Sequence, residues 1–110
     1  MTLGAYIRQV REKLREGNRT YSLRQVAQRI SVEPAYLSKI ERDQVPPPGE
    51  ETIRRLALDL GEDVDLLLAM AGKVSSDLQE IIRKRPLLFA DLLRKRHTDV
   101  LRICRTTLFK

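Results

Sequence analysis

The chain has 110 residues, of which 42% are hydrophobic, and it carries a formal net charge of +6. A chain of this length can bury one modest core, so we expect one compact domain with an appendage. Cys104 is the only cysteine, which excludes a disulfide within the chain and a site with several cysteine ligands, and favours a reducing, intracellular setting. We expect neither a signal peptide nor a membrane span, because no apolar segment has the required length and flanks.

Charge is distributed unevenly along the chain. Residues 1–42 hold nine Lys or Arg against four Asp or Glu, residues 43–72 hold two against seven, and residues 73–110 hold ten against four. A basic N-terminal part suits a surface that binds phosphates, because each neutralised phosphate releases counterions. The acidic middle is then expected to face away from such a partner. The alternative, that charge runs are simply solvated faces, stays open, above all for the last part.

A first helix is predicted near the N-terminus. Thr2 can cap its start, and Gly17 and Asn18 end it. Between these ends, apolar residues recur at the spacing of one helix face. They are Leu3, Tyr6, Ile7, Val10 and Leu14.

Residues 22–42, SLRQVAQRISVEPAYLSKIER, predict two short helices joined by a sharp turn. Tyr21 and Ser22 open the first of them. Pro34 fits the first turn of the second, where a missing N–H costs nothing, and Glu33 then takes its N-cap. The apolar positions are Val26, Ala27 and Ile30 on the first helix, Val32 at the turn, and Leu37 and Ile40 on the second. This is the layout of a DNA-binding helix-turn-helix.

Two more helices are predicted between residues 43 and 72. A loop with three consecutive prolines precedes them, Gly61 ends the fourth helix, and the fifth runs from its N-cap Asp63 to Gly72. Their apolar stripes are Ile53, Leu56, Ala57 and Leu60, and Val64, Leu67, Leu68 and Ala71. No segment shows the alternation of apolar and polar residues that is typical of a strand. We therefore predict an all-α fold, with a five-helix bundle over residues 1–72 and a C-terminal helical extension over residues 73–110.

The sequence of the extension predicts two helices, which are separated at Pro86. Ser76 and Gln79 form a capping-box pattern, and the apolar stripe of the second helix runs toward Thr107. Because so short and apolar a segment cannot form a core by itself, it must dock on the bundle or on another copy of itself. We predict that it is a dimer interface, and the alternative that it covers its own bundle stays open. The predicted dimer contacts are Leu78, Ile81, Ile82, Phe89, Leu92, Leu93, Val100 and Ile103.

From about Leu3 to Gly72, the sequence resembles the Cro and phage-repressor type helix-turn-helix family, also called the xenobiotic response element family. The resemblance rests on the order of the five helices, on the small Ala27 with its apolar neighbours, and on YLSKIER at residues 36–42. A Glu such as Glu41 commonly closes the recognition helix in this family. The resemblance implies a compact five-helix DNA-binding bundle.

Two positions depart from the family pattern. Ser31 stands where the family usually has Gly, at a turn residue that tends toward positive φ, so we expect strain there. Leu23 replaces a glutamine that often braces a phosphate or the recognition helix. That contact is not carried over, and Arg24 and Gln25 are the nearest residues that could supply another.

In a module of this kind, the second motif helix lies in the major groove and the first crosses the backbone. Base contacts are predicted for the outward residues Pro34, Ala35, Tyr36, Ser38 and Lys39. The alternative that Tyr36 packs its ring on the bundle and shows only its hydroxyl stays open. Phosphate contacts are predicted for Ser22, Arg24, Gln25, Arg42 and Gln44. Arg29 is expected on a solvated face.

The resemblance implies a sequence-specific transcriptional regulator in the cytoplasm, encoded by a bacterium or phage. We expect a repressor that binds a palindromic operator on double-stranded DNA as a homodimer. Two alternatives stay open: an antitoxin that autoregulates its operon and binds a toxin through its tail, and an adaptor that binds proteins without reading DNA sequence. Small members of the family are also inactivated by a companion metallopeptidase, for which the chain near Pro86 or Arg96 is a candidate cut site.

No enzymatic activity, cofactor or metal site is predicted. The sequence has no nucleophile with a matching base, no glycine-rich phosphate loop and no metal-ligand constellation. His97, the only histidine, is expected at the surface or an interface. Cys104 is expected to be a small buried hydrophobe, with a redox role beside Arg102 and Arg105 as the alternative. The basic clusters at residues 83–85 and 94–97 either contact phosphates or an acidic partner, or keep the apolar stripe soluble.

Overall fold

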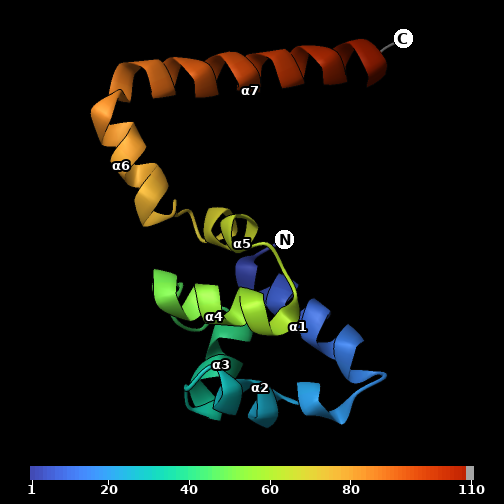
Figure 1. The fold of residues 1–110 in the computed structure, drawn as a ribbon. Coiled ribbons are helices and arrows are strands. Elements are labelled where there is room, and N and C mark those ends of the chain that lie inside the picture. Colours follow the sequence, from blue (N-terminus) through green and yellow to red (C-terminus); the bar gives the residue numbers. More distant parts are fainter. Residues whose placement is uncertain (109–110) are drawn as a thin grey trace. The chain divides into compact units, whose positions relative to one another are not determined.

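The computed structural model describes the backbone of residues 1–108 and the side chains of residues 1–97. All regular structure in the described residues is helical (Figure 1). The elements are α1 (Leu3–Arg15), the 3-10 helix η1 (Arg19–Tyr21), α2 (Leu23–Arg29), α3 (Pro34–Glu41), α4 (Glu50–Leu60), α5 (Val64–Met70), α6 (Ser76–Lys84) and α7 (Pro86–Leu108). The predicted all-α class, with a five-helix bundle and a helical extension, is confirmed.

Contacts between residues divide the chain into two compact units, Met1–Ser75 and Ser76–Lys110. The first unit contains α1 to α5, and the second contains α6 and α7. No helix in the described part of the chain is both long enough and apolar enough to cross a membrane.

The starts of the helices follow capping residues that the sequence shows. The side-chain oxygens of Thr2, Ser22 and Asp63 accept backbone N–H groups at the starts of α1, α2 and α5. Pro34 is the first residue of α3, after Glu33, whose side chain makes no capping hydrogen bond. The short helix η1 was not expected from the sequence.

Four helices end in a residue with left-handed backbone geometry. Gly61 and Gly72 end α4 and α5 with φ of 71° and 72°, as glycine readily allows. Ser31 and Asp43 follow α2 and α3 with φ of 62° and 57°. After α2, the Ser31 N–H donates to the Gln28 carbonyl at 3.2 Å, and the Val32 N–H donates to the Ala27 carbonyl at 3.0 Å. The positive φ expected at Ser31 is therefore present.

The core of the first unit is built from the predicted apolar stripes of α1 to α5. Its buried members are Leu3, Ile7, Val26, Ala27, Ile30, Leu37, Ile40, Ile53, Leu56, Ala57, Leu60, Leu67 and Leu68. Gly4 lets α1 approach the end of α3 closely, because a Cβ at this position would overlap the Ile40 carbonyl oxygen. Thr2 also reaches this end of α3, where its hydroxyl donates to the Asp43 carboxylate at 2.7 Å. The N-terminus of α1 thus packs closely against the C-terminal end of α3.

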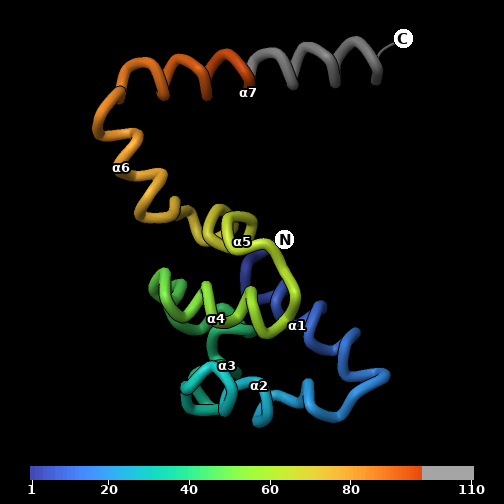
Figure 2. Tube along the Cα trace, in the orientation of Figure 1, coloured from blue at the N-terminus to red at the C-terminus, as the bar shows by residue number. Residues whose placement is uncertain are grey.

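The second unit contains the helices α6 and α7 (Figure 2). Several of its apolar side chains are exposed, among them Leu87 and Leu88. Pro86 begins α7, as the sequence indicates, and only Arg85 separates it from α6. Ser76, the first residue of the capping-box pattern, is the first residue of α6. Among the predicted dimer contacts, Leu78, Ile82 and Phe89 are half-buried, and Ile81, Leu92 and Leu93 are exposed. The remaining two, Val100 and Ile103, lie outside the described side chains, as does Cys104. A role in dimerisation stays a prediction.

Candidate nucleic-acid interface

The helices α2 and α3 form a rigid motif with one buried and one open face. Val26, Ala27 and Leu37 are each 0% exposed, so the inner faces of both helices are fixed in the core. Figure 1 shows α2 and α3 together at one end of the first unit, next to the connection that leaves α1. The turn between them is closed by backbone hydrogen bonds around Ser31. The outer face of α3 is consequently presented in one orientation.

The structure places the predicted base-contacting residues along this outer face. Ala35 and Lys39 are exposed, and Pro34 and Ser38 are half-buried. Tyr36 is half-buried and packs against the core cluster, so part of its ring belongs to the bundle. Ala35 and Lys39 are thus the most exposed of the five, and the base contacts stay predictions.

The predicted phosphate-contacting residues surround this face. Arg24, Gln25, Arg42 and Gln44 are exposed, and Ser22 is half-buried as the N-cap of α2. The Arg42 guanidinium donates to the Ser38 carbonyl at 3.3 Å, which holds it along α3. Their contacts with DNA stay predictions.

A buried ion pair ties α1 to the end of α3, and sequence reasoning missed it. Two nitrogens of Arg11 donate to the two carboxylate oxygens of Glu41, at 2.7 and 2.9 Å, and a third donates to the Tyr21 carbonyl at 3.3 Å. The two side chains are only 7% and 4% exposed. Hydrogen bonding to Glu41 raises the pKa of Arg11 above its ordinary value, against the opposing effect of burial.

The signal for this pair was present in the sequence. Arg11 follows Ile7 by four residues, so it falls on the apolar stripe of α1, and Glu41 follows Leu37 by four residues on α3. A charged residue in the middle of an apolar stripe requires a buried partner. Two such residues of opposite charge on neighbouring helices are therefore expected to form an ion pair.

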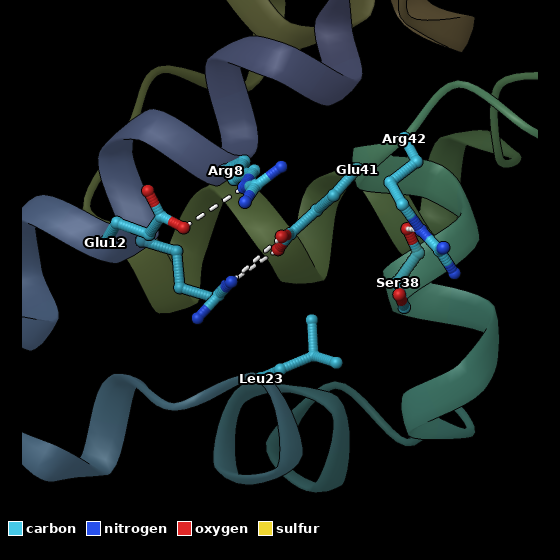
Figure 3. Close-up of a pocket in the computed structure, with 7 residues that line it drawn as sticks. Arg8, Glu12, Leu23, Ser38, Glu41 and Arg42 are labelled. Carbon is cyan, nitrogen blue, oxygen red and sulfur yellow. Dashed lines mark hydrogen bonds and ion pairs between the residues drawn. The ribbon is translucent and has the colours of Figure 1, made fainter.

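A cavity of about 280 Å³ lies beside this pair, between α1, α2 and α3 (Figure 3). Leu23 extends from α2 toward the Arg11–Glu41 pair, while Ser38 and Arg42 lie on the α3 side. Leu23 also packs against the core cluster. The residue that replaces the family's glutamine thus contributes apolar cover over the ion pair in place of a polar group.

Arg29 is exposed, as expected, but its guanidinium is also held against the bundle. It donates to both carboxylate oxygens of Asp59 on α4, at 2.6 and 3.0 Å. Its guanidinium carbon lies 5.1 Å from the ring centroid of Tyr21, within the range of a cation–π contact. The bonds to Asp59 raise the pKa of Arg29. This arginine joins the end of α2 to α4.

The comparisons with known proteins agree with this geometry. Residues 2–70, more than half of the chain, match the family model described as a helix-turn-helix domain. The chain belongs to the helix-turn-helix domain family. The resemblance to Cro and phage-repressor type regulators is confirmed, and this helix-turn-helix protein is a DNA-binding regulator.

A solved structure described as a SinR protein/SinI protein complex is similar to the helix-turn-helix protein in fold. The TM-score is 0.52 at 24% sequence identity, over 88% of this chain and 99% of that chain. No curated protein sequence matches the chain. In the described residues of the helix-turn-helix protein, no group of three or more His, Cys, Asp or Glu side chains is placed to hold a metal ion.

Proposed function

We propose that this DNA-binding regulator is a repressor that occupies a palindromic operator as a homodimer. The observation that carries the proposal is the outer face of α3, which is polar, basic and held in one orientation by the buried faces of α2 and α3. Such a face fits the major groove, where each base pair shows a distinct pattern of donors and acceptors. A repressor needs only this occupancy, because a bound protein blocks access to a promoter.

Selection of bound duplexes from a random pool tests sequence reading and two-fold assembly together. Enrichment of an inverted repeat, with half-sites about one helical turn apart, is the expected result. No enrichment would overturn the proposal and favour an adaptor that does not read DNA sequence.

Lys39 is the residue to test for base reading. Its ammonium group can donate to guanine O6 or N7, so Lys39→Ala is expected to weaken binding to the selected operator by about 1–3 kcal/mol and to relax the preference at one base pair. Arg24→Ala is the comparison, because removal of a cation that binds phosphate weakens all duplexes alike. If Lys39→Ala lowers the affinity for every sequence equally, Lys39 does not read a base.

The dimer is proposed to form through the second unit. Leu92 and Leu93 are 50% and 58% exposed in the single chain, and neighbouring Leu87 is 80% exposed. A second copy would remove this apolar surface from water. The expected solution mass at micromolar concentration is twice that of one 12.7 kDa chain. Leu92→Lys is expected to return the protein to one chain, whereas Leu58→Lys, at a leucine 72% exposed on α4, leaves the mass unchanged.

A protein partner is the second candidate role for this unit. The similar solved structure is described as a complex of SinR protein with SinI protein, so a related fold occurs together with another protein. The same mass measurement separates the two roles. A single-chain mass with and without DNA would refute the homodimer and favour a partner, such as a toxin, on the apolar face of α7.

A further inference from the structure

The connection between α1 and α2 carries two arginines that no ion pair uses. Arg15 is the last residue of α1, and Arg19 is the first residue of η1. Both are exposed, and neither forms an ion pair with a carboxylate in the described part of the chain. Neither was among the residues predicted to contact DNA.

Hydrogen bonds hold this connection in one conformation. The Asn18 carboxamide oxygen accepts from the Thr20 N–H at 3.0 Å and from the Thr20 hydroxyl at 2.6 Å. The Tyr21 N–H donates to the Asn18 carbonyl at 3.2 Å, and the Tyr21 carbonyl accepts from the buried Arg11. Because the backbone is already ordered, binding through Arg19 would cost little additional backbone entropy.

The two arginines share a cavity with two of the predicted phosphate contacts. Arg15, Arg19, Ser22 and Gln25 all line a hollow of about 800 Å³, and Glu16 is the one carboxylate in its lining. The Ser22 oxygen accepts the Gln25 N–H at 3.3 Å, which leaves the hydroxyl proton free to donate. The hollow therefore combines two guanidinium groups with neutral hydrogen-bond donors, a set that suits phosphate oxygens.

We propose that Arg15 and Arg19, together with Ser22 and Gln25, bind backbone phosphates of the DNA that flanks the groove entered by α3. The inference rests on the proposed DNA-binding function and adds a site to it. In this motif α2 crosses the DNA backbone. Arg19 opens η1, the element before α2, and Arg15 ends α1 at the other side of the connection. Their contacts extend the footprint without reading sequence.

Arg15→Gln and Arg19→Gln test the site, with Lys13→Gln as the matched control. Lys13 is an exposed cation on the same helix, but its direction differs from that of Arg15 by about 160° around α1. It lines a different cavity with Tyr6. Each arginine variant is expected to weaken binding about fivefold or more at 0.1 M salt, on selected and unrelated duplexes alike. The slope of log affinity against log salt is expected to fall by about one for each phosphate that is no longer neutralised.

Two further measurements make the test specific to this hollow. Glu16→Gln is expected to tighten binding, because it removes the one negative charge in the lining. Shortening the duplex at both ends is expected to abolish the difference between wild type and the arginine variants, while the effect of Lys39→Ala persists. The inference is overturned if the arginine variants match Lys13→Gln in affinity and salt slope. A wild-type protein that binds no duplex would instead refute the proposed function itself.

Discussion

The buried pair of Arg11 and Glu41 gives the sharpest prediction for stability. Glu41→Gln keeps the volume of the side chain but leaves the Arg11 charge without its counterion at a site where the two side chains are 7% and 4% exposed. Two of the three hydrogen bonds of Arg11 go to this carboxylate. The variant thus buries an uncompensated charge without creating a cavity.

The expected loss is a large part of the total stability. Breaking a buried ion pair by removing one partner costs about 3–5 kcal/mol. A bundle of this size has roughly 4–11 kcal/mol in all, from about 0.05–0.15 kcal/mol per residue. With a urea m-value of about 1–2 kcal/mol per molar, the unfolding midpoint is expected to fall by about 1.5 M or more.

Urea unfolding followed by circular dichroism measures this shift, and the chain supplies its own control. Arg8 and Glu12 form an ion pair of the same kind on α1, but their side chains are 56% and 52% exposed. Glu12→Gln is therefore expected to cost less than about 1 kcal/mol. Replacing both buried partners, as in Arg11→Met with Glu41→Leu, is expected to recover most of the loss. Equal effects of Glu41→Gln and Glu12→Gln would refute the argument from burial.

Three other substitutions test the backbone and pH behaviour. Ser31→Gly is expected to raise the stability by about 1 kcal/mol in thermal unfolding, because φ is 62° there. A destabilised variant would show that the Ser31 backbone is not strained. Gly4→Ala is expected to lower it by about 1–3 kcal/mol, because its Cβ overlaps the Ile40 carbonyl; an unchanged melting temperature would show that α1 can shift freely. The Tyr6 hydroxyl donates to Glu62 at 2.9 Å, and this bond raises its pKa. The free energy of unfolding is therefore expected to decline as the pH rises from about 10 through the raised pKa. Urea unfolding across this pH range measures the decline, and Tyr6→Phe should lack the part that this hydroxyl contributes.

The sequence predicted those parts of the fold that depend on local patterns. Apolar spacing located all five helices of the bundle, and the caps Thr2, Ser22 and Asp63 are present as expected. These features were readable because each depends on residues within one or two helical turns. The 3-10 helix η1 was missed, since its three residues carry no periodicity.

The contacts that join distant segments were not predicted. The bond from Arg29 to Asp59 was not predicted, because the two residues are thirty positions apart and no local pattern joins them. Gly4 drew no attention because a glycine in a helix has no pattern until the neighbouring helix is known. The outer face of α3 could be read directly, since an amphipathic helix with one apolar side leaves the other side open.

The ion pairs of the first unit separate cations that hold the bundle from cations that remain available to DNA. The arginines with carboxylate partners are Arg8, Arg11, Arg29, Arg54 and Arg55. Glu50, Glu51 and Asp59, three carboxylates of the acidic middle, are already paired with three of these arginines. Most cations outside these pairs lie between the end of α1 and the end of α3: Arg15, Arg19, Arg24, Lys39 and Arg42. Because only Lys39 among these cations is predicted to read a base, we expect affinity to depend steeply on salt and sequence preference to depend on a few side chains of α3.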